Sequence, residues 1–127
     1  MSDEKAHHHQ PFPEDEEGEP RPQPTSYTMV EPRFRERYFQ FYKETYKPSV
    51  LDRKTKELVA IGASLAAKCQ GCLEGHVKKA LKFGASREEI SETIAIAIGV
   101  NAAAVVDLTD IAADNMNLRL FPGPEKK

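Results

Sequence analysis

The segment KCQGCLEGH, Lys68 to His76, holds both cysteines of the chain and its only histidine after residue 9. Cys69, Cys72 and His76 follow one another at steps of three and four residues, which would place them on one face of a helix. This spacing could bind a zinc ion, form a local disulfide or support thiol chemistry. The sequence on either side has to distinguish among these three uses.

The composition favours a soluble, cytoplasmic protein. The chain has 127 residues, 39% hydrophobic and 30% charged, a length typical of one domain. Its N-terminus lacks the apolar region of a signal peptide, and its longest apolar run, Ala95 to Val106, is too short to cross a bilayer. We therefore expect a cytoplasmic protein with no membrane partner. In that reducing compartment a C-x-x-C pair is more often redox-active or metal-binding than purely structural.

The charges divide the chain into two parts. Residues 1–31 are proline-rich and hold eight acidic and two basic side chains, so we predict a disordered tail that cannot bury enough apolar surface to offset its ordering entropy. His7, His8 and His9 in this tail could bind a metal ion weakly, although a solvated tail is the simpler interpretation. Residues 32–121 hold fourteen basic and eleven acidic side chains, but the basic ones are scattered, so no nucleic-acid partner is expected.

Residues 32–118 are predicted to form an all-α domain, followed by a C-terminal tail at 119–127. Pro32 suits a helix start and Pro48 ends that helix. Asp52 is a plausible N-cap for a helix over residues 53–67. The first of these helices has an aromatic face, more typical of a core or subunit contact than of a cofactor site, formed by Phe34, Tyr38, Phe41 and Tyr42.

The second half of the domain continues this helical pattern. A helix after the cysteines ends where Gly84 fits the C′ position, and Ser86 with Glu89 forms a capping box that opens a last helix over about 87–118. That helix is apolar on most sides, although Gly99 and Asn101 could break it. A chain of this size has too few residues to cover such a helix, so we predict a homo-oligomer. No stretch alternates as a β-strand does, which excludes a thioredoxin fold.

The cysteine pair gains reactivity if the helix begins near Cys69. Side chains three residues apart on a helix have Cβ atoms roughly 5–6 Å apart, slightly more than a disulfide prefers, so the bond is within reach. Both thiols would lie in the first helical turn, where unpaired N–H groups and the helix dipole favour thiolates. His76 could accept or return the proton.

Glu57 can join this group only if the chain turns. On one continuous helix it would lie about 18 Å from Cys69 along the axis. A turn around residues 67–70 would fold two helices together and let the carboxylate reach His76. From spacing alone, a solvated glutamate paired with a lysine is the simpler interpretation.

Glu57, Cys69, Cys72 and His76 match the E-x11-C-x2-C-x3-H signature, and the chain resembles the AhpD-like alkylhydroperoxidases of the carboxymuconolactone decarboxylase family over roughly residues 34–118. The resemblance implies an all-α fold assembled as trimers or hexamers. It also implies that Glu57 and His76 relay protons beside a redox disulfide of Cys69 and Cys72. The decarboxylase branch lacks this cysteine pair, so the resemblance points to the redox branch.

We therefore predict a thiol-dependent peroxidase or disulfide oxidoreductase. We assign the attack on a hydroperoxide substrate to Cys72, the nearer neighbour of His76, after which Cys69 would form the disulfide. The reverse order of the two cysteines stays open at the level of sequence. No bound cofactor is expected; a lipoyl or thioredoxin-like dithiol reductant would restore the thiols.

Two alternatives remain open at the level of sequence. Cys69, Cys72 and His76 could bind zinc, but structural zinc usually has four protein ligands and only Glu57 or a tail histidine could be the fourth. The domain could also be a helical oligomerisation module whose cysteines are merely buried.

Overall fold

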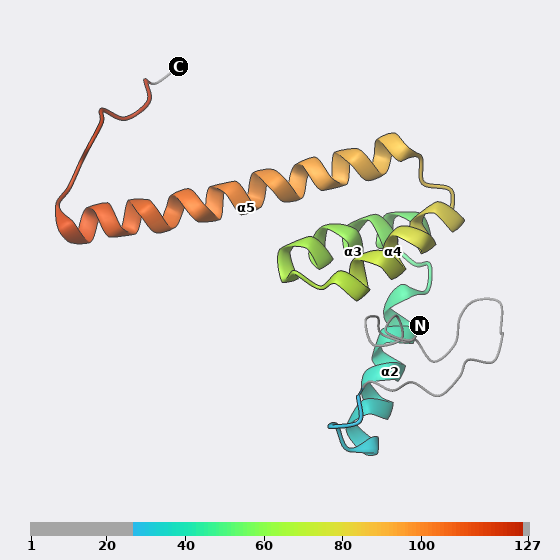
Figure 1. Ribbon diagram of the computed structural model, residues 1–127. Helices are drawn as coiled ribbons and strands as arrows, with labels where there is room; N and C mark the ends of the chain where they lie inside the picture. Colours follow the sequence, from blue (N-terminus) through green and yellow to red (C-terminus); the bar gives the residue numbers. More distant parts are fainter. Residues whose placement is uncertain (1–26, 126–127) are drawn as a thin grey trace, which may run out of the picture. The chain divides into compact units, whose positions relative to one another are not determined.

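The structure is a computed structural model that describes residues 27–125 (Figure 1). These residues form four helices and no strand, which are α2 (Pro32–Tyr46), α3 (Arg53–Ala67), α4 (Gln70–Lys82) and α5 (Arg87–Met116). The predicted all-α fold is confirmed for this part of the chain. The histidines at positions 7–9 and most of the predicted acidic tail lie outside the described residues, so the expected boundaries 1–31, 32–118 and 119–127 stay predictions.

Helices α3 and α4 form an antiparallel pair, visible side by side in Figure 1. Asp52 caps α3 as predicted, because its carboxylate accepts the backbone N–H of Thr55 at 2.8 Å. The pair is joined by only Lys68 and Cys69. Lys68 adopts the left-handed conformation with φ 60°, which a helix C-terminus commonly requires and which non-glycine residues seldom adopt. This turn reverses the chain directly before the cysteine pair.

A small apolar core holds the first compact unit, which extends to Ala97. Ile61, Ala80 and Ala85 are buried at its centre. Their partly buried neighbours come from α3, α4 and the first turns of α5, and are Leu58, Leu65, Leu73, Val77, Ile90 and Ile94. The site-bearing pair α3–α4 is thus held in place by the beginning of α5.

The beginning of α5 follows the predicted capping box. The backbone N–H of Glu89 donates to the Ser86 hydroxyl at 3.0 Å, and the Glu89 carboxylate accepts the backbone N–H of Ser86 at 2.9 Å. Lys54 of α3 also donates to Glu89 at 3.0 Å. The helix then continues to Met116 without interruption, so the break considered at Gly99 or Asn101 does not occur.

Most of α5 is exposed within the single chain. Ala97 is its only buried residue, whereas apolar side chains such as Ile98, Val105 and Leu108 are more than half exposed. By length and composition alone this helix could cross a membrane, with a mean hydropathy of 1.8 over its most apolar window. The run Ala95 to Val106 is too short for this by itself, but adjoining residues of α5 extend it. One such helix is weak support for a membrane span, since a helix covered by another subunit has the same composition.

Asp52 should make the stability of the protein sensitive to acid. Its hydrogen bonds with Thr55 lower the pKa of the Asp52 carboxyl, so this contribution to stability is present above the unfolded-state pKa and is lost as the pH falls through the folded-state pKa. An asparagine at the same position would cap the helix without titrating. We expect the difference in melting temperature, wild type minus Asp52→Asn, to fall between pH 5 and pH 2. Thermal melts followed by circular dichroism would measure it.

Asp110→Asn, at an exposed position within α5, is the matched control for this experiment. A wild-type advantage over Asp52→Asn that stays constant across the whole pH range would contradict the assignment of the cap.

Candidate functional site

The turn at Lys68 brings Glu57 of α3 against His76 of α4. The Nδ1 atom of His76 lies 2.7 Å from the Oε1 atom of Glu57, and both side chains are buried, Glu57 completely. The two residues are neighbours because α3 and α4 run antiparallel. The geometric requirement stated from the sequence, a turn just before Cys69, is therefore met, and the interpretation of Glu57 as a solvated residue paired with a lysine is wrong.

The second carboxylate oxygen of Glu57 binds an arginine. The Nε atom of Arg53 donates to Oε2 of Glu57 at 2.8 Å, and the Arg53 side chain is only 13% exposed. A completely buried carboxylate thus accepts hydrogen bonds on both of its oxygens. Buried charges need such partners, because the loss of hydration is otherwise very unfavourable.

Cys69 and Cys72 form a disulfide at the start of α4, with their Cα atoms 5.3 Å apart. Cys69 is the N-cap residue, and its Sγ atom lies 3.2 Å from the backbone N–H of Cys72, which donates to it. The predicted helix start near Cys69 is confirmed. A thiolate formed at Cys69 after reduction would receive this same hydrogen bond, and helix N-termini favour thiolates.

Two tyrosines of α2 stack on the imidazole ring of His76. The ring centroids lie 5.4 Å away for Tyr46 and 6.4 Å away for Tyr42, with interplanar angles of 24° in both cases. Burial, together with the nearby negative charge of Glu57, raises the pKa of Tyr46 to about 12 and that of Tyr42 further still. Both phenols therefore stay neutral at physiological pH and form an uncharged wall beside the imidazole.

A cavity of about 310 Å³ opens onto the disulfide. Cys69, Cys72 and His76 line one part of it, and α3 contributes small side chains including Ala63 and Ser64. The α2 side is mainly aromatic, with Tyr38, Phe41, Tyr42 and Tyr46 beside Thr45. No Lys, Arg, Asp or Glu is among the lining residues in the described part of the chain, so the cavity suits an uncharged, largely apolar molecule.

Sequence reasoning missed two parts of this arrangement. The aromatic face of α2 was expected to be core or subunit contact. None of its residues is buried within the chain, so the core interpretation is wrong, and several of them line the cavity. Subunit contact stays a prediction. Arg53 was not identified, although its i, i+4 spacing from Glu57 permits an ion pair. That spacing could have indicated the pair, but not its burial.

A metal centre gains no support from the geometry. No group of three or more His, Cys, Asp or Glu side chains placed to hold a metal ion occurs among residues 27–125. The sulfurs of Cys69 and Cys72 are bonded to each other, and the Nδ1 atom of His76 is engaged by Glu57.

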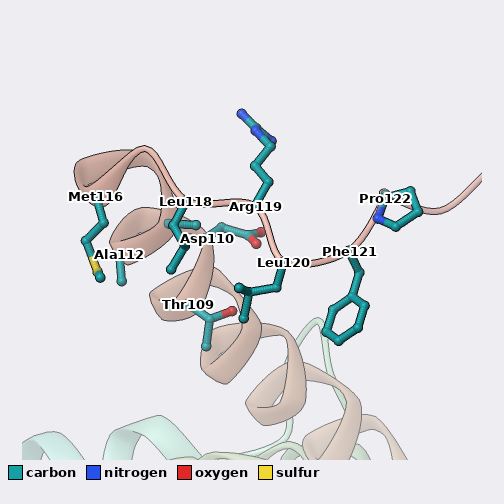
Figure 2. A pocket seen from close by; sticks show the side chains of 11 residues that line it. Thr109, Asp110, Ala112, Met116, Leu118, Arg119, Leu120, Phe121 and Pro122 are labelled. Atoms are coloured by element: carbon teal, nitrogen blue, oxygen red, sulfur yellow. The ribbon is translucent and has the colours of Figure 1, made fainter.

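A second, larger hollow lies in the other compact unit, which begins at Ile98. It measures about 830 Å³ and lies between the end of α5 and the segment that follows it. Figure 2 shows Leu120 and Phe121 on one side of that segment and Arg119 pointing the opposite way. No cysteine or histidine is among its lining residues, so none of the predicted site residues lies there.

Comparison with known proteins identifies relatives. The family model of the carboxymuconolactone decarboxylase family matches residues 32–114. Among curated proteins, "uncharacterized protein 4 in cox locus" of Paracoccus denitrificans is 39% identical over 62 residues, which cover 49% of this chain and 56% of that protein. The chain thus matches little more than half the length of this curated relative.

Two solved structures of carboxymuconolactone decarboxylase family proteins are also similar to this chain. A carboxymuconolactone decarboxylase family protein from Legionella pneumophila is 33% identical, with a TM-score of 0.52, over 54% of this chain and 62% of that one. A protein of the same family from Thermotoga maritima is 32% identical, with a TM-score of 0.50, over 67% of this chain and 96% of that one. Involvement in an antioxidative response has been suggested for the Thermotoga protein.

Proposed function

Because this chain belongs to the carboxymuconolactone decarboxylase family, we propose that it is a thiol-dependent oxidoreductase that reduces organic hydroperoxides through Cys69 and Cys72. The observation that carries this proposal is the hydrogen bond of 2.7 Å between His76 and the buried Glu57, because His76 lines the same cavity as both cysteines. A thiol pair, a proton carrier and a residue that orients it are the parts that activated-thiol chemistry requires. The antioxidative role suggested for the Thermotoga relative agrees with this activity.

The reaction would proceed in two thiol steps. The Cys72 thiolate attacks one oxygen of the hydroperoxide, the O–O bond breaks, and Cys72 becomes a sulfenic acid. The departing alkoxide takes a proton, for which His76 is the donor, and leaves as the alcohol. The Cys69 thiolate then attacks the sulfenic sulfur, the S–O bond breaks as the disulfide forms, and the departing hydroxide takes a proton from solvent and leaves as water. Glu57 accepts a hydrogen bond from His76 throughout and holds the orientation of the ring.

The disulfide must be reduced from outside for turnover. We propose a dithiol such as a lipoyl group or a thioredoxin-like protein in the cytoplasm, which becomes a disulfide itself while Cys69 and Cys72 return to thiols. A partner protein disulfide could replace the hydroperoxide as oxidant at the same site. The uncharged lining of the cavity favours an apolar group on whichever molecule enters it.

Consumption of an organic hydroperoxide, measured in the presence of a lipoyl, a thioredoxin-like and a small-molecule dithiol, tests this function. We expect turnover with at least one of the three donors, and loss of both titratable thiols when the reduced protein receives one equivalent of hydroperoxide. Retention of two free thiols after that treatment would refute the mechanism.

We further propose that α5 is covered by other copies of this chain in a homo-oligomer, a trimer or hexamer. Ile98 and Val105 lie seven residues apart on one face of α5 and are 63% and 61% exposed. Burying a face of this kind is favourable at about 25 cal/mol for each Å² of apolar surface, and a second copy offers the same apolar face. Ile98→Glu should therefore dissociate the assembly, as measured by size-exclusion chromatography with light scattering.

Asp107→Lys is the control for that experiment, because Asp107 lies nine residues after Ile98 and so on the opposite face of the helix. We expect this variant to keep the wild-type mass. A wild-type protein that elutes as a monodisperse monomer would rule out the assembly.

A further inference from the structure

Glu57 and His76, the proposed proton-transfer pair, form a closed ring of contacts with two further side chains, Arg53 and Tyr46. Arg53 binds Glu57, and Glu57 binds His76. The imidazole of His76 stacks on Tyr46, and the guanidinium of Arg53 lies 5.6 Å from the centroid of the Tyr46 ring. The ring therefore joins α2, α3 and α4, and Arg53 and Tyr46 are its two members outside the E-x11-C-x2-C-x3-H signature.

We propose that Arg53 is a positioning residue that sets how tightly the Glu57–His76 pair holds a proton. This inference rests on the proposed function, in which that pair serves the thiols. Arg53 acts through Glu57 and touches neither the cysteines nor the cavity among the contacts described above.

The surroundings of Arg53 fix its guanidinium in one place. Its Cζ atom lies 4.5 Å from the centroid of the Phe83 ring, which is at the C-terminal end of α4, while Tyr46 approaches from α2. Contact with the face of an aromatic ring stabilises a guanidinium electrostatically. An ordinary surface arginine would be free to leave its partner, whereas Arg53 is held within 2.8 Å of Glu57.

The charge of Arg53 bears directly on the proton affinity of the pair. The Glu57 carboxylate is completely buried, and a positive charge within 4–6 Å of a carboxylate favours its ionised form. Arg53 thus places a positive charge directly beside the Glu57 carboxylate. Without Arg53, the same buried charge would be balanced by protonation of the pair, which would then keep its proton to higher pH.

The other groups that face His76 do not replace this charge. Tyr42 and Tyr46 on α2 remain neutral because burial raises the pKa of each phenol. Cys69 and Cys72 on α4 do not titrate while the disulfide is intact. Lys79 of α4 lies over the ring of Tyr42, 5.9 Å from its centroid. Arg53 is the cation bonded to Glu57 in the described part of the chain.

The oxidised full-length protein provides a direct test. The imidazole resonances of His76 are followed by NMR against pH in wild type, Arg53→Gln, Arg53→Lys and Arg87→Gln, with the His76 signal assigned by its loss in His76→Ala. The Arg87 side chain is 92% exposed and paired with Glu88. Arg87→Gln therefore removes the same charge as Arg53→Gln, but from an exposed position. Because the disulfide does not titrate, the midpoint reports the Glu57–His76 pair.

We expect the midpoint in Arg53→Gln to rise by roughly one pH unit, the lower end of the range for an opposite charge at this distance. Arg53→Lys should restore most of the wild-type value, and Arg87→Gln should leave it unchanged. The limb of the pH–rate profile that reports the pair should move in the same direction in Arg53→Gln, whereas a merely structural role would lower the rate equally at every pH.

An unshifted His76 midpoint in folded Arg53→Gln would overturn the proposal. If Arg53→Gln does not fold, Arg53→Lys provides the test. A His76 midpoint close to that of wild type, with lowered turnover, would support the proposal. A midpoint raised by the full shift expected for loss of the charge would overturn the proposal, because lysine keeps that charge. The NMR titration does not depend on peroxidase activity. Absence of turnover in the wild type would therefore refute the proposed function, whereas the His76 midpoints of the Arg53 variants could still be interpreted.

Discussion

Cys72→Ser is expected to abolish hydroperoxide reduction, with a loss of turnover on the order of 10³-fold or more, as is typical when an activated nucleophile is removed. A serine hydroxyl is far less acidic than a thiol, and it cannot form the sulfenic acid on which the next step depends. Hydroperoxide consumption with a saturating dithiol donor would measure the loss.

Cys69→Ser is the informative companion to this variant. Its Cys72 thiol should still react once with a hydroperoxide, and the sulfenic acid should persist because the resolving thiol is absent. A reagent that traps sulfenic acids would detect one adduct per chain in Cys69→Ser and none in Cys72→Ser. The reverse labelling pattern would show that Cys69 attacks first, and turnover at the wild-type rate in Cys72→Ser would exclude the thiol mechanism.

Glu57→Ala is expected to lower the free energy of unfolding by about 3–5 kcal/mol, the range found when one partner of a buried ion pair is removed. The substitution leaves the largely buried Arg53 without its carboxylate and the Nδ1 atom of His76 without its acceptor. Since domains of this size are stable by only about 5–15 kcal/mol, a large part of the native stability would be lost. Urea unfolding followed by circular dichroism would measure the change.

Two variants separate the causes of that loss. Glu57→Gln keeps the volume and the hydrogen-bonding capacity of the side chain and removes its charge, so it should destabilise less than alanine. Glu92→Ala removes a carboxylate from an exposed position on α5 and should change stability by less than about 0.5 kcal/mol. Equal effects of Glu57→Ala and Glu92→Ala would contradict the description of Glu57 as a buried, doubly bonded carboxylate.

Several helix ends could be predicted because they depend on hydrogen bonds between residues close in sequence. Asp52, Gly84 and the Ser86–Glu89 box each define a helix end through one or two backbone hydrogen bonds, and the structure places helix ends at all three. Lys68 gave no such signal, since its left-handed conformation is one that its side chain does not favour. The turn before Cys69 was therefore predicted only from what Glu57 would need in order to reach His76.

The site was harder to predict wherever it depends on contacts between helices. The C-x-x-C-x-x-x-H spacing identified Cys69, Cys72 and His76, but no spacing shows that Tyr46 stacks on His76, because these residues come from separate helices. The apolar composition of α5 led us to predict that another copy of the chain covers it. Since the pattern of one chain does not contain its neighbour, it could not show what supplies that cover.

The connection between α3 and α4, only Lys68 and Cys69, also bears on how the site forms during folding. Glu57 and His76 are 19 residues apart in sequence, and the entropy lost on closing a loop grows only with the logarithm of its length. Contacts of such short range form early, before those that join distant segments. A nascent chain that has emerged as far as Phe83 already contains Arg53, Glu57, both cysteines and His76, so Glu57 and His76 can come together before any of α5 has left the ribosome. Ile90 and Ile94 of α5 then complete the core that holds the two helices in place.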